Sequence, residues 1–430
     1  MTASDTAAFE AADQNQRTRI LIQLTQAGYI DTADMMLHRY PLQGPTALNR
    51  TLFLEGVILE KRGDNRGAAA KFRSALANDP QLTLVRAELA YVLARMNETE
   101  SAKHHLMLLR GAIDDPETRA GVQSFINSLD ASRPFHFSGY VSLAPSTNIN
   151  QGSSHDTVYS PGLGGVDGLD PVGTISPNSR KQSGVGISAG GSVGYVRPIG
   201  RSMQAVFAAG ASSTYYPMVN ETSFGLSQSA ELRWLNPNGY FGAGAVAQEG
   251  VDPRTVSVNY KAYGPRVSML RQISPRDQLS ADITYQWRDY GTGSAANGTS
   301  LSFSSIWTHA LDAGSNIAFL VGVDRVEQQL DFNSYRDGSI GAGFYKEMRH
   351  GLTVEGQASA RYALFNAENP FTSTTRQDTA LTGSLTFTKR DWNWAGFAPS
   401  LNYTYLRNFS NISLYDYDSH ALDFRLTKDF

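Results

Sequence analysis

The stretch Leu279-Ser-Ala-Asp-Ile-Thr-Tyr-Gln-Trp-Arg288 alternates apolar and polar side chains without a break. Its odd positions carry Leu, Ala, Ile, Tyr and Trp, and its even positions carry Ser, Asp, Thr, Gln and Arg. Successive side chains of an extended strand point to opposite faces, so this period of two predicts a strand with one apolar and one polar face. The same alternation runs through Ser183–Tyr195 and Leu352–Leu364.

The length of these runs indicates the kind of sheet. They extend over about 12–16 residues, whereas strands of soluble proteins have a mode of about 5–6, and a tilted strand needs about 9–11 residues to cross a bilayer. Aromatic residues such as Tyr195, Trp234 and Trp287 recur where the runs finish, as in the girdles of outer-membrane barrels. Because the bilayer core offers no water to unpaired strand edges, such strands must close into a barrel. A soluble β-sandwich is the alternative.

Short turn-like segments alternate with more variable, Gly- and Ser-rich loops after residue 134. The short segments are 197–201, 236–239, 274–277, 311–315, 348–351 and 389–393. Six short turns and seven other loops predict fourteen antiparallel strands, and an even number returns the chain to the side on which it entered. We expect the short turns to face the periplasm and the loops to face the exterior.

The composition changes sharply near Pro134. Residues 1–133 hold 7 of the 39 glycines and none of the five tryptophans, and they lack the alternation seen later. We therefore divide the chain into a helical domain, residues 1–133, and a transmembrane barrel, residues 134–430. The predicted fold class is α + β in two domains.

The helical part contains an internal repeat. A shift of 34 residues maps Gly56 onto Ala90, Gly63 onto Asn97 and Phe72 onto Leu106, which resembles the tetratricopeptide repeat. Small residues at 56 and 68 would let paired helices approach closely, and Phe72 would fill the space beneath them. An ordinary helical bundle is the alternative. By repeat position, the residues predicted to line a cargo-binding groove are Phe53, Val57, Glu60, Tyr91 and Ala94.

Alternation also assigns charged residues to the barrel interior. The predicted lumen residues are Glu231, Arg233, Asp282, Arg288, Glu355, Arg361, Asp423 and Arg425. Mixed charge in a wet lumen costs little because it never meets lipid. The last strand ends in Phe430, which resembles the signal by which outer-membrane barrels are recognised for insertion.

Composition excludes several classes of function. A net charge of −3 argues against a nucleic-acid-binding surface. The absence of cysteine excludes thiolate metal sites and cysteine nucleophiles. No metal or cofactor is expected. The start, Met1-Thr-Ala-Ser-Asp-Thr, lacks the basic and apolar segments of a signal peptide, so for a barrel we expect that the signal peptide has been removed.

Candidate catalytic groups are few, and we expect no enzyme activity. His104 and His105 are adjacent on a predicted helix, which places them on different faces and predicts a solvated surface. Outer-membrane phospholipases use a Ser/His pair on the barrel exterior. His309, His350 and His420 fall near strand ends, but no serine partner is identifiable.

A short helical-repeat domain in front of a fourteen-stranded barrel resembles the surface lipoprotein assembly modulator (Slam) family of type XI secretion. The stretches that carry the resemblance are Glu55–Gly63, Val85–Ala90, Phe137–Asn150 and Tyr263–Arg266. It implies an outer-membrane translocator that receives a specific protein, a surface lipoprotein or a soluble secreted protein, from the periplasm. It also implies a monomer that depends on the barrel-assembly machinery, periplasmic chaperones and outer-membrane lipid. Only two repeats are clear, which leaves the cargo class open.

Two other functions fit the same order of domains. Polysaccharide-export porins also join tetratricopeptide repeats to a barrel, although they usually carry many repeats and sixteen or more strands. A passive diffusion porin with an accessory helical domain is the other alternative.

Overall fold

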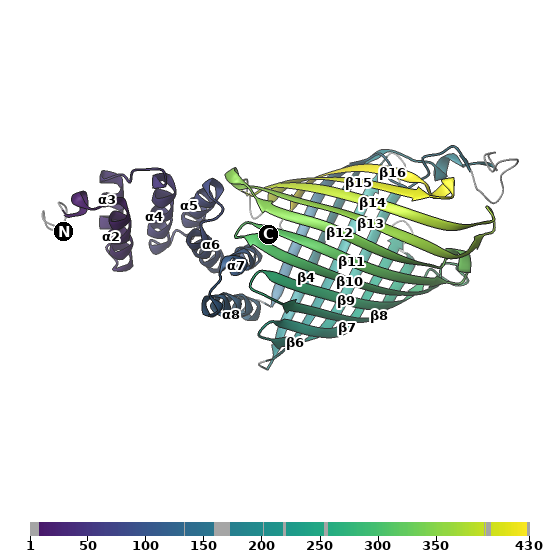
Figure 1. Ribbon diagram of the computed structural model, residues 1–430, viewed down its shortest axis with the longest axis horizontal. Coiled ribbons are helices and arrows are strands. Elements are labelled where there is room, and N and C mark those ends of the chain that lie inside the picture. Colours follow the sequence, from purple (N-terminus) through teal and green to yellow (C-terminus); the bar gives the residue numbers. More distant parts are fainter. Residues whose placement is uncertain are drawn as a thin grey trace.

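The computed structural model describes residues 8–132, 134–158, 173–200, 202–217, 221–252, 257–390, 392 and 397–427. A stack of helices precedes a closed barrel, and it lies against one end of that barrel (Figure 1). Among the described residues, no helix combines the length and the apolar character needed to cross a membrane.

The helices form a stack of consecutive antiparallel pairs, in which α2 contacts α3, α4 contacts α5, and α6 contacts α7. Their bounds are α2 (Gln14–Gln26), α3 (Ile30–Arg39), α4 (Ala47–Lys61), α5 (Asn65–Asn78), α6 (Thr83–Arg95), α7 (Thr99–Ala112) and α8 (Pro116–Ser132). The stack extends away from the barrel, with α2 and α3 farthest from it and α6 to α8 nearest (Figure 1).

The sequence repeat is also a repeat of the backbone. The turns within the three pairs contain Gly28, Gly63 and Asn97, whose φ angles are +88°, +85° and +70°. This left-handed conformation ends a helix, and Gly and Asn tolerate it best. Gly63 and Asn97, which the 34-residue shift aligns, and Gly28, 35 residues before Gly63, therefore have the same structural role.

Close helix packing explains the small residues of the repeat. A Cβ atom on Gly56 would lie 2.5 Å from Cε1 of Phe72, and the Phe72 side chain is fully buried between α4 and α6. Ala68 and Ala90 are also fully buried in this region. The expectation that a small residue at 56 makes room for Phe72 is confirmed.

The rest of the chain forms one closed barrel of fourteen antiparallel strands, as predicted. The strands are β1 (Phe135–Ser146), β4 (Gly184–Ile199), β5 (Met203–Tyr216), β6 (Glu221–Asn236), β7 (Gly239–Asp252), β8 (Ser257–Gln272), β9 (Asp277–Asp289), β10 (Gly298–Asp312), β11 (Ser315–Gln328), β12 (Tyr335–Glu347), β13 (Leu352–Asn369), β14 (Thr374–Lys389), β15 (Ala398–Ser410) and β16 (Tyr417–Thr427). Consecutive strands pair with one another, and β1 pairs with β16 to close the ring. Strands β2 (Thr157–Val158) and β3 (Gly173–Thr174) form a small separate sheet in the loop after β1.

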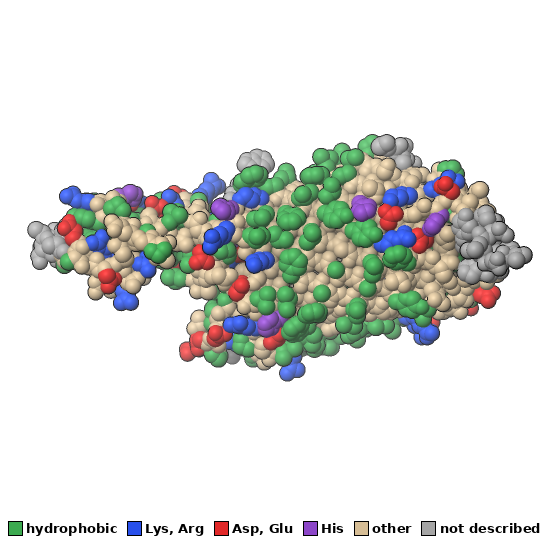
Figure 2. Space-filling model, turned by 45° about the horizontal axis from the view of Figure 1, so that its top comes forward, with side chains coloured by type: hydrophobic (Ala, Val, Ile, Leu, Met, Phe, Trp, Pro, Cys, Tyr) green, Lys and Arg blue, Asp and Glu red, His purple; other side chains and the backbone are tan. Residues whose placement is uncertain are grey.

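Alternation divides the strands into an outer and an inner face. Outward side chains such as Phe319, Val321 and Ile340 are about half exposed or more, and apolar side chains cover the middle of the barrel wall (Figure 2). Charged side chains gather toward its two ends (Figure 2). An apolar outer wall on a closed barrel with an even number of strands is the lipid-facing surface of outer-membrane proteins. The barrel therefore spans the outer membrane.

The short connections between strands lie at one end of the barrel and the longer ones at the other. The helical domain lies at the end that carries the short turns, here called the short-turn end, for example Asn236–Gly239 and Asp312–Ser315. The other end, the long-loop end, carries the loop that joins β1 to β4. Phe430 lies outside the described residues.

The packing at Gly56 predicts opposite effects for two helical glycines. We expect Gly56→Ala to lower the melting temperature of the helical domain, because the added methyl group overpacks a buried ring at a cost of about 1–3 kcal/mol. Gly121→Ala on α8 meets no atom within 4 Å and should raise it through better helix propensity. Circular dichroism at the helical minimum measures both. If both substitutions changed the melting temperature equally, the close packing of Phe72 against Gly56 would be contradicted.

Candidate functional site

The helical domain is joined to the barrel through a buried ion pair. Arg86 on α6 donates from Nη2 to Oε2 of Glu347 at 2.6 Å and to the carbonyl oxygen of Pro80 at 2.7 Å. The Arg86 side chain is 0% exposed and that of Glu347, the last residue of β12, is 11% exposed. Both charges are removed from water, so loss of either one would leave the other buried without a counter-charge. We call the ion pair and the side chains around it the docking network.

Two histidines on α7 complete the docking network. Nη1 of Arg390 lies 2.6 Å from Nε2 of His104, and Nη1 of Arg86 lies 3.2 Å from Nδ1 of His105. A ring nitrogen that accepts from a guanidinium carries a lone pair, so both histidines are neutral in this arrangement. Burial and the Arg390 charge lower the pKa of His104 to about 4, and burial and Arg86 hold the pKa of His105 well below its usual value.

The expectation that His104 and His105 form a solvated surface is wrong. Their helix packs against the rim of the barrel, where a Cβ on Gly111 of α7 would lie 2.9 Å from Cβ of Ala310 of β10. Arg276 adds an ion pair to Asp114, 3.6 Å apart, at the same rim. Local sequence contained no signal for this contact, because the barrel groups beside the histidines, Glu347 of β12 and Arg390 just after β14, are far away in the sequence.

A small cavity of about 70 Å³ lies beside the docking network. Residues of the helical domain, including Leu76, Pro80 and Leu89, form one wall, and Met348 and Leu352 of the barrel form the other. This cavity belongs to the domain interface and leaves the two domains in direct contact around it.

The predicted groove residues differ in how much surface they offer. Val57 and Glu60 are buried, at 8% and 5% exposure, and Phe53 packs between the two clusters of the helical core. Ala94 is partly buried. Tyr91 is 47% exposed, so it presents the largest side-chain surface of the five.

Polar and aromatic neighbours surround Tyr91. Its ring lies 6.5 Å from that of Phe125 on α8 and 5.9 Å from the Arg95 guanidinium. Arg95 in turn lies 3.3 Å from Glu60. Burial and the neighbouring Glu60 raise the pKa of Glu88, on the same helix as Tyr91. The arrangement is an exposed tyrosine backed by a partly buried phenylalanine, beside a partly buried charge pair.

The residues predicted for the lumen lie on the inward face of their strands, and most have partners there. Arg233 donates to Glu231 at 2.9 Å, and Arg361 donates to Asp337 at 2.5 Å. Further inward contacts join Asp282 with Arg266, Arg288 with the hydroxyl of Tyr290 at 2.8 Å, and Asp423 with Arg425 at 3.9 Å. Sequence alternation missed the partners Arg266 and Asp337, although both fit the same period.

The lumen is open in its middle. The inward side chains of Glu355, Gln357 and Ser359 on β13 are exposed, so the described part of the chain does not fill the space in front of them. Water therefore reaches the inner wall, and polar side chains there need no protein partner.

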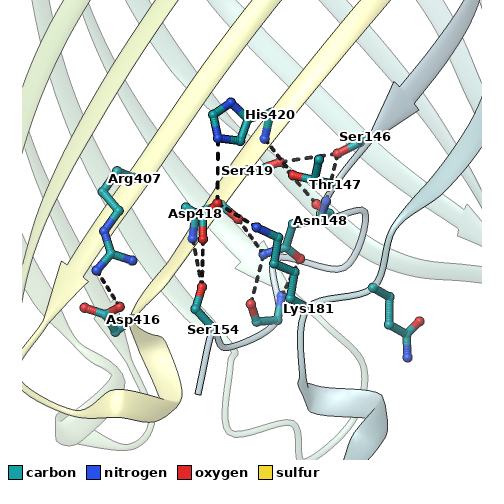
Figure 3. A network of polar contacts seen from close by, with 12 residues as sticks. Ser146, Thr147, Asn148, Ser154, Lys181, Arg407, Asp416, Asp418, Ser419 and His420 are labelled. Carbon is teal, nitrogen blue, oxygen red and sulfur yellow. Dashed lines mark hydrogen bonds and ion pairs between the residues drawn. The ribbon is translucent and has the colours of Figure 1, made fainter. Parts of the chain in front are cut away.

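At the opposite end, the long loop after β1 packs on the hairpin of β15 and β16 (Figure 3). Lys181 donates to Asp418 at 2.6 Å, and Ser154 donates to the other oxygen of the same carboxylate at 3.0 Å. Thr147 and His420 exchange two hydrogen bonds of 2.9 Å. These contacts join the first strand to the last beyond the end of their sheet pairing.

Among the described residues, no serine hydroxyl is bonded to the imidazole of His309 or His420. Nδ1 of His309 lies 2.8 Å from Asp277, and Ser274 donates to that same carboxylate rather than to the imidazole. Nδ1 of His420 lies 2.8 Å from the hydroxyl of Tyr403. A nucleophilic serine needs its hydroxyl on the imidazole, and neither histidine has this arrangement. His350 lies in the turn after β12, where its carbonyl oxygen accepts from Lys389.

A protein family, two curated proteins and solved barrels resemble this chain. The model of the family described as "Surface lipoprotein assembly modifier" matches residues 135–430. The "Hemophilin secretion modulator" of Acinetobacter baumannii is 22% identical over 88% of this chain and 79% of its own. The "Surface lipoprotein assembly modifier" of Pasteurella multocida is 20% identical over 96% of this chain and 82% of its own. The crystal structure of a FadL homologue of Pseudomonas aeruginosa aligns with a TM-score of 0.36 and 10% identity, covering 69% of this chain and 90% of that one.

The buried ion pair predicts that Glu347→Gln undocks the helical domain. It leaves the Arg86 charge buried without a counter-charge, which costs about 3–5 kcal/mol. A Cβ on Gly314 would lie 3.5 Å from Cβ of Pro80, within disulfide range, and the chain has no other cysteine. We expect Glu347→Gln to lower the cross-linking yield of the Pro80→Cys/Gly314→Cys pair.

Two controls make this result specific. Glu55→Gln removes a carboxylate that pairs with Lys71 inside the helical domain, so it should not change the yield. The double change Arg86→Met/Glu347→Leu removes both charges together and should restore much of the yield. If Glu347→Gln cross-links as well as the unchanged chain, the ion pair does not hold the domains together.

The lowered histidine pKa predicts that acid weakens docking. The pKa of His104 rises from about 4 to its ordinary 6.5 when the site opens, so docking is most stable above 6.5 and becomes weaker as the pH falls toward 4. Arg86, Arg390, Tyr345 and Glu347 face the two rings, and protonation would add a cation beside two arginines. Spin labels on Met107→Cys and Leu311→Cys, both exposed positions on α7 and β10, should move apart on acidification.

His104→Gln/His105→Gln is the control for this measurement. It should remove most of the pH dependence of the label distance, because no imidazole remains to be protonated. A distance that stays constant down to about pH 4, or that changes equally in the control, contradicts the assignment.

Proposed function

Because the chain belongs to the surface lipoprotein assembly modifier family, we propose that it receives a specific protein cargo in the periplasm and moves it to the cell surface or the medium. The cargo is a surface lipoprotein or a soluble secreted protein. The barrel itself is a secretion-related protein of the outer membrane.

One observation carries this proposal: the helical domain is fixed to the rim of an open barrel by the buried pair of Arg86 and Glu347. Short turns of outer-membrane barrels face the periplasm, so the docked domain stands at the periplasmic entrance. A receiving surface held in place there raises the local concentration of bound cargo at the mouth.

The Tyr91 surface is our candidate for first contact with the cargo. Exposed aromatic side chains backed by a second ring and flanked by arginine are frequent anchors of protein interfaces, and Tyr91 lies against Phe125 and Arg95. Phe53, Val57, Glu60 and Ala94 support this surface from within the helical domain.

The inner wall suits a polypeptide in transit. Its charges are paired, Arg361 with Asp337 across neighbouring strands and Arg233 with Glu231 along β6, so no strong net field of one sign holds back a passing chain. The exposed Glu355, Gln357 and Ser359 keep the wall hydrated.

The remaining partners follow from this role. The barrel-assembly machinery inserts the barrel, and periplasmic chaperones hold the cargo until it reaches the helical domain. We assign no catalytic step and no cofactor, and folding of the cargo outside the cell supplies direction. A monomer suffices, because one chain closes its own barrel.

Export from a deletion strain tests the proposal. Without the gene, a specific protein should accumulate in the periplasm and disappear from the surface or medium, and the unchanged gene should restore it. We expect Tyr91→Ala to restore several-fold less export at an equal amount of inserted barrel, because truncation of an interface anchor costs about 2 kcal/mol or more. Quantitative proteomics of the surface, medium and periplasm measures the cargo.

Tyr29→Ala is the matched control, because Tyr29 is 62% exposed but lies between α2 and α3, away from Tyr91. It should restore full export. An unchanged surface and secreted proteome in the deletion strain contradicts translocation, and loss of exopolysaccharide with normal protein export would favour a polysaccharide porin. Full export with Tyr91→Ala would show that the cargo does not bind at Tyr91, and it would leave the proposal of translocation standing.

A further inference from the structure

Two arginines face each other on the lipid side of the barrel at the long-loop end. Arg325 of β11 and Arg336 of β12 are direct cross-strand partners. Arg325 has the same outward parity as Val321 and Val323, and Arg336 the same as Ile340. Both side chains are exposed.

The position of this pair along the wall corresponds to the outer headgroups. Lys346 is the outward charged residue at the opposite end of β12, ten residue steps from Arg336. That separation is about 33 Å along a strand and about 25 Å along the membrane normal at a tilt of about 40°. The apolar band of an outer-membrane barrel is also about 25 Å tall. Lys346 therefore marks the inner headgroups and Arg336 the outer ones.

The pair lacks enough negative charge from the protein. Glu327 lies 2.5 Å from Arg325, and it is the one carboxylate that the described residues provide to the two arginines. The other cross-strand neighbours are apolar, Leu301 beside Arg325 and Leu364 beside Arg336. Like charges directly opposite each other destabilise a sheet, so an anion between them would stabilise this one.

Two other outward cations of the described strands at this end have carboxylates beside them. Lys261 of β8 lies between two cross-strand carboxylates, Glu249 on β7 and Asp289 on β9. Arg407 of β15 lies 2.7 Å from Asp416. Arg336, in contrast, has only Arg325 and the apolar Leu364 as cross-strand partners, which leaves a place at which a ligand can supply the negative charge.

We propose that Arg325 and Arg336 bind the phosphate group of an anionic lipid in the outer leaflet. Guanidinium groups bind phosphate oxygens in a bidentate manner, and two of them on adjacent strands approach a single headgroup from both sides. The lipid chains then lie along the apolar rows below, which contain Val323 and Ile340. This site is independent of cargo transport.

Native mass spectrometry of the full chain in a non-ionic detergent tests the site. The probes are phosphatidic acid, which carries a phosphomonoester, and phosphatidylcholine, which has no net charge. We expect Arg336→Gln to lower the affinity for phosphatidic acid about fivefold, and Arg325→Gln/Arg336→Gln to lower it further. Binding of phosphatidylcholine should not change. Lys261→Gln, the matched control, should bind both lipids as the unchanged chain does.

Each remaining outcome overturns the proposal. Unchanged binding of phosphatidic acid by Arg336→Gln shows that the pair is not the site. A parallel loss of phosphatidylcholine shows apolar packing instead of phosphate recognition. Displacement of phosphatidic acid by an equal concentration of inorganic phosphate shows a free-ion site. Arg336→Gln disturbs no ion pair or hydrogen bond of the described residues, and the heat-dependent gel mobility of its barrel verifies that it is folded.

Discussion

Every other feature of this molecule depends on the backbone hydrogen bonds that close the barrel. Inside a bilayer no water satisfies an open strand edge, so β1 must pair with β16 although they are the two ends of the domain. Their ladder joins Tyr140 to Thr427 and Leu143 to Phe424, and it is interrupted at Ala144 and Pro145. Proline has no N–H to donate. The closing seam is therefore less regular than the pairing of β1 with β4, which includes both residues.

The long loop compensates for that interruption. Immediately beyond it, Thr147 and His420 exchange two hydrogen bonds, and Lys181 and Ser154 bind Asp418 on the last strand (Figure 3). The polar contacts of the loop thus extend the seam where the sheet becomes irregular. The loop that connects β1 to β4 therefore binds β16, the strand on the other side of β1. These side-chain contacts add to the backbone hydrogen bonds that close the barrel.

Sequence predicted the parts of the structure that depend on local patterns. Alternation in Leu279–Arg288 and turn spacing were sufficient for the strands and their number, because membrane strands place every second side chain in lipid. The repeat placed Gly56 against Phe72 for a similarly local reason. The docking network was not predictable, because Arg86 and Glu347 are far apart in the sequence and neither has a local signature. For the same reason His104 and His105 were misjudged, and Val57 proved to be buried.

The docking network explains why the helical domain behaves as part of the barrel and not as a tethered accessory. Helix α8 ends at Ser132 and β1 begins at Phe135, so the connection itself allows little separation, but a short connection alone leaves rotation free. Two contacts restrain this rotation. Glu347 accepts a hydrogen bond from Arg86 of the helical domain, and Arg390 of the barrel donates to the ring of His104. A single carboxylate thus balances two arginines, and the histidines between them must remain neutral. The orientation of the helical domain, and with it that of Tyr91, is set by the barrel wall, since closure of the barrel fixes the position of Glu347.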